Sequence, residues 1–138
     1  MYLIDTDVVS EARKRANANP RVVDFFNRVV AADEPVYLSA VSVGELIRHR
    51  GDVDRAKLLE AWLTMVPEQF GANILASDAD SAQVWGRLRV PDPKHELDKQ
   101  IAAIALVSDL TVVTRNKADF QGTGVKLMNP FRPVPAVE

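Results

Sequence analysis

The feature that most constrains the fold is a series of short apolar segments separated by stretches with helical periodicity. Each apolar segment spans three to five residues and is bounded by charged or turn-forming residues. Short apolar strands that alternate with helices are typical of a parallel sheet covered on both faces. We therefore expect an α/β fold whose parallel sheet has about four to five short strands. The expected strands are 2–4, 36–40, 73–76, 110–114 and 125–128.

The stretches between these segments carry helix signals. The clearest lies in 21–32, where valine and phenylalanine recur at the spacing of one helix face and Pro20 is a plausible first helical residue. Ser77 or Asp78 is expected to cap a later helix. The expected helices are 8–14, 21–32, 40–50, 56–66, 77–90 and 95–109.

Polar residues follow two of the expected strands directly. Asp5 comes after the first strand, and 114–116 come at the end of the strand at 110–114. In an open parallel sheet, ligands bind at the carboxyl ends of the strands. Asp5 and this segment should therefore face the same edge of the sheet.

The composition limits the chemistry available at that edge. The chain has 138 residues and is 47% hydrophobic, which suits one domain with a packed core. It has no cysteine and two histidines, which excludes disulfides, thiol nucleophiles and sites built from cysteine or several histidines. Any metal would be held mainly by carboxylates, which favours Mg²⁺ or Mn²⁺. The net charge of −2 neither supports nor forbids nucleic acid as a partner.

Five acidic residues stand out, and each has a structural alternative. Asp5 and Asp7 could cap the following helix, although two acids beside a buried strand repel each other unless a cation balances them. Glu45 could form a capping box with Ser42, or lie inside a helix capped by Ser39. Spacing alone does not choose between those two positions for Glu45.

The other two acids, Asp98 and Asp119, lie in the C-terminal half of the chain. Asp98 could be an acid favoured by the helix dipole, but it also falls on the apolar stripe of 97–105, where an acid needs a partner. Asp119 could cap a short turn before the following phenylalanine, and Thr114 and Asn116 could be turn residues.

Four motifs in order resemble one protein family. YLIDTDVVSE, LSAVSVGEL, LDKQIAAIAL and LTVVTRNKADF, followed by GTGVKLMNP, are similar to PIN-domain proteins of the VapC-type (FitB-like) toxin group of bacterial toxin–antitoxin pairs. The resemblance runs over nearly the whole chain. It implies a PIN-like three-layer α/β fold and a single PIN domain over 1–138, with 128–138 as an irregular tail.

The resemblance also implies an activity and a site. In the family, acids gathered at one sheet edge bind Mg²⁺ or Mn²⁺ and cleave RNA. Carried over by motif, the catalytic acids are Asp5, Glu45, Asp98 and Asp119. Asp5 and Asp98 are the expected metal ligands, and the expected supporting residues are Asp7, Thr114 and Asn116.

Two departures from the family pattern affect this site. Position 7 is usually asparagine, and the extra charge of Asp7 could tighten metal binding or raise the pKa of a neighbouring acid. The connection before Asp98 is also shortened to VPDPKHEL. Lys99 and Gln100 follow it, where small or apolar residues are common.

Two other functions remain as alternatives. A strand followed by DxDxV also begins haloacid-dehalogenase-like phosphatases, in which Asp5 would be the nucleophile and Asp7 the general acid. That family needs a later acidic pair after another strand, which LTVVTRN lacks. A catalytically silent PIN-like binding module is the second alternative, and the presence of all four acids argues against it.

The resemblance implies partners as well. We expect an RNA substrate, a cognate antitoxin that masks the acids, a homodimer and a hetero-oligomer with the antitoxin. Apolar residues of 56–66 could supply the antitoxin groove or the dimer contact. No apolar run approaches 18 residues and no signal peptide is evident, so we expect a cytoplasmic protein without a membrane span.

Overall fold

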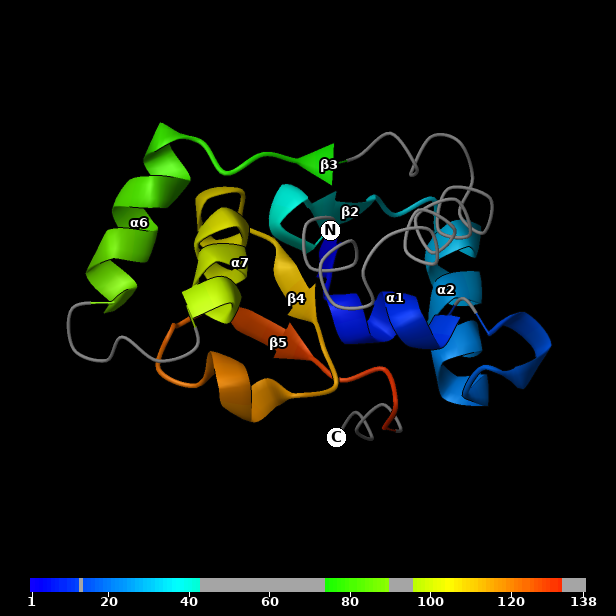
Figure 1. Ribbon diagram of the computed structural model, residues 1–138. Coiled ribbons are helices and arrows are strands. Elements are labelled where there is room, and N and C mark those ends of the chain that lie inside the picture. The colour runs from blue at the N-terminus through cyan, green and yellow to red at the C-terminus, as the bar shows by residue number, and fades with distance from the viewer. Residues whose placement is uncertain (13, 43–73, 90–95, 133–138) are drawn as a thin grey trace, which may run out of the picture.

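The protein is described by a computed structural model that covers residues 1–12, 14–42, 74–89 and 96–132. Its strands form one sheet in the order β3-β2-β1-β4-β5, and every neighbouring pair is parallel (Figure 1). The strands are β1 (Tyr2–Ile4), β2 (Val36–Ser39), β3 (Ile74–Leu75), β4 (Thr111–Val113) and β5 (Lys126–Met128). The predicted parallel sheet is therefore confirmed. β1 has the predicted bounds, and the other four strands are one or two residues shorter than the apolar segments suggested.

The described helices also follow the sequence pattern. They are α1 (Thr6–Ala12), α2 (Pro20–Ala31), α6 (Ala79–Arg89) and α7 (Glu96–Val107), with 3₁₀ turns η1 (Arg15–Asn17) and η2 (Lys117–Phe120). Residues 40–42 are helical as well. The rest of the predicted helix 40–50 and all of 56–66 lie outside the described residues.

Local caps explain where these helices begin. The Asn19 side chain accepts a hydrogen bond from Arg21 N, and Pro20 occupies the first helical position as predicted. Asp78, not Ser77, caps α6, because its carboxylate accepts from Ser81 N at 2.9 Å. No described helix is both long and apolar enough to cross a membrane.

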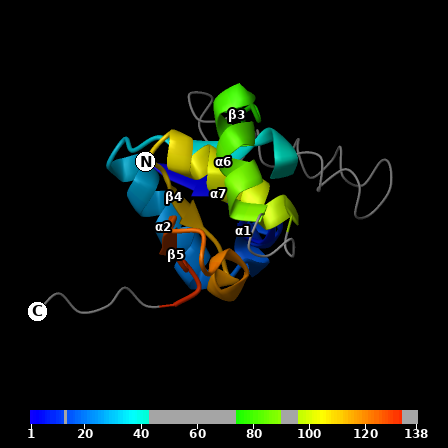
Figure 2. The ribbon, with the colours of Figure 1, turned by 90° about the vertical axis from the view of Figure 1, so that its left-hand side faces the viewer.

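The sheet separates two apolar clusters, because successive side chains of a strand point to opposite faces. Ile4 and Val113 pack with the buried residues of α1 and α2. Leu3 and Val112 pack with those of α7. Figure 1 shows α1 and α2 on one side of the sheet and α7 on the other, and Figure 2 shows α6 lying over α7. The three-layer arrangement expected from the resemblance is confirmed.

The order of the strands creates the position for a ligand. The chain builds β1, β2 and β3 toward one edge of the sheet and then returns to β1 to add β4 and β5. Ligands of such sheets bind outside the carboxyl ends of the strands at this reversal point. In this protein the point lies between β1 and β4, which end next to Asp5 and Thr114.

The segment after β5 was predicted as an irregular tail beginning at residue 128. Met128 instead pairs with Val113 as the last residue of β5. Residues 129–132 form a turn, in which the Asn129 side chain accepts a hydrogen bond from Phe131 N at 2.9 Å. The remaining residues, 133–138, lie outside the described part.

Candidate active site

Asp5 is fixed at the point where β1 and β4 end. Its backbone N–H donates to Val113 O at 2.9 Å, which extends the β1–β4 pairing by one residue. Its Oδ2 accepts from the Thr114 hydroxyl at 2.8 Å, and its Oδ1 accepts from Thr6 N at 2.8 Å. The side chain is only 7% exposed. Both carboxylate oxygens are thus oriented by hydrogen bonds from residues that follow β4 and β1.

The surroundings of Asp5 disfavour its charged form. Burial raises the pKa of this carboxyl above its usual value, and the negative charge of Asp119 raises it further. The hydrogen bonds from Thr114 and Thr6 act in the opposite direction without cancelling the effect. A carboxylate in this position is stabilised by a bound cation, which offsets both the burial and the repulsion.

Asp7 lies in the first turn of α1, the helix that begins directly after Asp5. Its Oδ2 accepts hydrogen bonds from Arg115 N at 3.1 Å and from Asn116 Nδ2 at 3.4 Å. Its Oδ1 is buried and accepts no hydrogen bond among the described residues. Burial, followed by the charge of Asp5, raises the pKa of Asp7 to about 7. The surroundings of Asp7 therefore favour its protonated form to a much higher pH than usual for an aspartate.

The polar residues after β4 connect the two aspartates. Thr114 is fully buried. Its hydroxyl oxygen accepts a hydrogen bond from Asn116 N at 3.1 Å, and its O–H donates a hydrogen bond to Asp5 Oδ2. Asp119 follows in η2, and its N–H donates to Asn116 O at 3.1 Å. The structure thus brings together Asp5, Asp7, Thr114 and Asn116 through hydrogen bonds, and Asp119 through its electrostatic effect on Asp5.

Two predicted site residues remain, Asp98 and Glu45. Asp98 is half-buried in the first turn of α7, between the half-buried Leu97 and the buried Lys99. Glu45 lies outside the described residues. Of the two caps left open by the sequence, the structure has Ser39 and not Ser42: Ser39 Oγ accepts from Ser42 N at 2.9 Å, at the start of the helical residues 40–42. Ser42 is therefore inside the helix.

The donor set suits a hard divalent ion, although its extent stays a prediction. Within the described ranges, no three acidic or histidine side chains are close enough to hold one ion together. Asp5 and Asp7 nevertheless offer carboxylate oxygens, and the buried Asp7 Oδ1 has no hydrogen-bond donor in the part of the chain that the structure describes. Oxygen atoms are the ligands that Mg²⁺ and Mn²⁺ prefer, and Mg²⁺ sites often need only one or two carboxylates.

Two basic residues, Arg115 at this edge and the buried Lys99 of α7, were not predicted as part of the site. Arg115 follows Thr114 directly, its guanidinium lies 4.7 Å from the centre of the Phe131 ring, and its charge lowers the pKa of Asp7 against the larger effect of burial. Lys99 is 7% exposed, and a lysine so deeply buried is generally paired with an acid. The signal that could have identified Arg115 is its position at the carboxyl end of a central strand.

The family of the chain follows from its match to a protein-family model. The model described as "PIN domain" matches residues 2–125, which is most of the chain. This protein belongs to the PIN-domain family. The haloacid-dehalogenase-like phosphatase is thereby excluded as the family of the chain, because the DxDxV motif occurs here within a PIN domain.

Relatives of this PIN-domain protein come from bacteria. Toxin FitB of Neisseria gonorrhoeae is 31% identical, and the alignment covers 95% of this chain and 99% of FitB. VapC ribonuclease Y4jK of Sinorhizobium fredii is 25% identical over 96% of this chain and 99% of that protein. In a solved structure of FitAB bound to an IR36 DNA fragment, one chain matches with a TM-score of 0.76 and 29% identity, over 98% of this chain and 99% of that chain.

Proposed function

We propose that this PIN-domain protein is a metal-dependent ribonuclease toxin that a cognate antitoxin neutralises. The observation that carries the proposal is the buried Asp5, which Thr114 holds at the reversal point of the sheet. The charge of Asp119 raises the pKa of Asp5, and the charge of Asp5 raises that of Asp7. The similarity to Toxin FitB and to a VapC ribonuclease supports the same activity.

Mg²⁺ or Mn²⁺ is the proposed cofactor, with Asp5 and Asp98 as the ligands and Asp7 as a supporting residue. When bound, such an ion favours deprotonation of water and offsets negative charge on the scissile phosphate. Thr114 orients the Asp5 carboxylate, and Asn116 orients Asp7. Asp119 and Glu45 complete the acidic set and serve to hold a water molecule or accept its proton.

The proposed partners follow from the toxin assignment. They are an RNA substrate, a cognate antitoxin that covers the acids with a basic side chain, and a second copy of this chain in a homodimer. The hetero-oligomer of toxin and antitoxin is placed in the cytoplasm, and residues 1–138 are taken as one domain. The segment 56–66, suggested for one of these contacts, lies outside the described residues.

The proposal is tested with RNA cleavage and Mn²⁺ binding by the full chain, purified away from any antitoxin. Asp98→Asn should lose at least about 100-fold in cleavage rate and should weaken Mn²⁺ binding measured by calorimetry. Glu96→Gln is the matched control, because Glu96 lies in the same first turn of α7 but is exposed. It removes one charge from the same helix end and should change neither quantity.

The alternatives give different results in the same experiment. Asp5→Asn should abolish cleavage while the variant keeps a cooperative melting transition. Full cleavage by both Asp5→Asn and Asp98→Asn would refute the assignment of the site. Absence of RNA cleavage by the wild type with bound metal would favour the silent binding module.

A further inference from the structure

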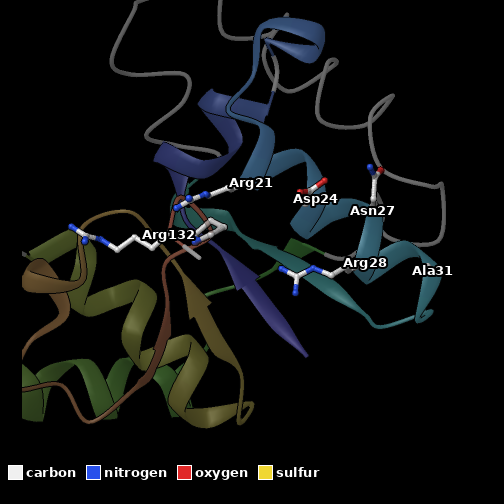
Figure 3. Close-up of a pocket in the computed structure, with 7 residues that line it drawn as sticks. Arg21, Asp24, Asn27, Arg28, Ala31 and Arg132 are labelled. Atoms are coloured by element: carbon white, nitrogen blue, oxygen red, sulfur yellow. The ribbon is translucent and has the colours of Figure 1, made fainter. Parts of the chain in front are cut away.

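A basic groove lies beside the acidic edge, and no step of the proposed cleavage uses it. The groove has a volume of about 490 Å³. Figure 3 shows Arg21 and Arg28 extending from α2 toward the side on which Arg132 lies. Its lining comes from α2 and from the turn after β5: Arg21, Asp24, Asn27, Arg28, Ala31, Pro130 and Arg132.

The lining is positively charged in a chain whose net charge is −2. Among the described lining residues there are three arginines and one aspartate, Asp24. Among the described residues, none of these arginines forms an ion pair with a carboxylate. Arginine presents several N–H donors in a fixed plane, which matches the oxygens of a phosphate group. The groove is therefore suited to a phosphate-bearing ligand.

The groove begins at the edge where the acids lie. At its Arg21 end, Nη1 of Arg21 donates to Phe131 O at 3.5 Å. The guanidinium of Arg115 lies over the ring of the same phenylalanine, and Arg115 N donates to Asp7. Arg28 lies seven residues after Arg21, which places it two helical turns, or about 10 Å, farther along the same face of α2. The basic side chains thus continue outward from the acidic edge.

We propose that this groove binds the sugar–phosphate backbone of RNA on one side of the cleavage site. The inference rests on the proposed ribonuclease function and adds the path of the substrate. A strand whose scissile phosphate lies at Asp5 passes Arg115 and enters the groove at Arg21. Positively charged grooves that follow the backbone are the usual means of holding single strands without reading their sequence. An acidic protein segment is less suited, because the described part of the lining has few apolar residues, Ala31 and Pro130.

The test measures RNA binding separately from cleavage. Fluorescence anisotropy with a labelled single-stranded RNA, in EDTA and over a series of salt concentrations, compares the wild type with Arg28→Gln/Arg132→Gln. The double variant should bind roughly tenfold more weakly, and the salt slope should become shallower by about 1.4, because two phosphate contacts are lost. Arg21 is retained because it holds the turn after β5.

The charge-matched control is Arg87→Gln/Lys126→Gln, which removes two exposed basic side chains from α6 and β5. It should bind the RNA like the wild type. A dinucleotide is too short to reach the groove from the acids and should not distinguish the two double variants. Equal weakening by both double variants would show general charge attraction and overturn the proposal.

A substitution that should strengthen RNA binding separates the effect of the groove from a loss of folding. Asp24→Asn removes the acid found among the described lining residues and should tighten RNA binding. Unchanged RNA binding by both Arg28→Gln/Arg132→Gln and Asp24→Asn, including the case in which antitoxin binding changes instead, overturns the proposal. Groove-dependent RNA binding without any metal-dependent cleavage would support the groove and refute the proposed function, so the two failures are distinguishable.

Discussion

The hydroxyl of Thr114 donates a 2.8 Å hydrogen bond to Oδ2 of Asp5 and thereby joins the ends of the two central strands. Both residues are buried, and they are separated by 109 positions in the chain. The bond favours the ionised form of Asp5, whose pKa burial otherwise raises. Thr114 is therefore a positioning residue, and its expected role is to keep Asp5 able to bind a cation.

Thr114→Val removes this bond with little change in side-chain shape. We expect about 1–2 kcal/mol loss of stability, because the buried Asp5 Oδ2 loses its donor. We also expect roughly tenfold weaker Mn²⁺ binding by calorimetry, the size typical of lost second-layer support.

Thr123→Val is the control for this prediction. Thr123 is also buried, but its hydroxyl donates to Phe120 O at 2.6 Å, in the turn before β5. It should lower the free energy of unfolding by a similar amount and leave Mn²⁺ affinity unchanged. Equal Mn²⁺ affinity in the two variants would contradict the role given to Thr114.

Asp7→Asn is predicted to stabilise the metal-free protein above pH 7. The folded pKa of Asp7 is raised from 3.8 to about 7, so the wild type loses stability as pH rises through this interval. The variant lacks this loss, and the gain should be on the order of 1–4 kcal/mol. Below pH 4 the effect should vanish, because Asp7 is then protonated in both the folded and unfolded states.

The measurement is the melting temperature in EDTA across this pH range. Asp5 also has a raised pKa, so part of the pH dependence should remain in the variant. Asp24→Asn, at an exposed position of α2, should keep the full wild-type pH dependence. A melting temperature of Asp7→Asn that falls with pH as steeply as the wild type's would refute the burial of charge at this position.

Ser39→Ala is predicted to lower the free energy of unfolding by about 1 kcal/mol or somewhat more. The change removes the oxygen that accepts from Ser42 N, and it also removes the 3.0 Å contact of Ser39 Oγ with Ser42 Oγ. Both serines are fully buried, so water does not replace the lost partner.

Urea unfolding measures this effect. Ser77→Ala is the matched control, because Ser77 precedes a helix in the same way but is exposed and leaves the cap to Asp78. It should stay within about 0.5 kcal/mol of the wild type. If Ser39→Ala lowers the free energy of unfolding no more than Ser77→Ala does, Ser39 does not cap the helix.

The sequence alone was sufficient for the fold and for the edge at which the site lies. Strand length, helical periodicity and caps are local properties, so YLI and TVV could be identified as strands without knowledge of their neighbours. A parallel sheet brings the carboxyl ends of its strands to one edge, which placed Asp5 and Thr114 together in advance. Position in the chain also identified Asp98 and Asp119 as candidates through their motifs.

Only the tertiary structure decided the properties that depend on residues far apart in the sequence. The elevated pKa of Asp7 arises from burial and from the charge of Asp5, and no sequence pattern measures burial. The helix cap at Ser39 rather than Ser42 depended on where β2 ends. The contact of Arg115 with Phe131, and the groove that begins there, required β4 and the turn after β5 to meet in space. The sequence determined which groups reach the edge of the sheet, and packing determined their charge state and their neighbours.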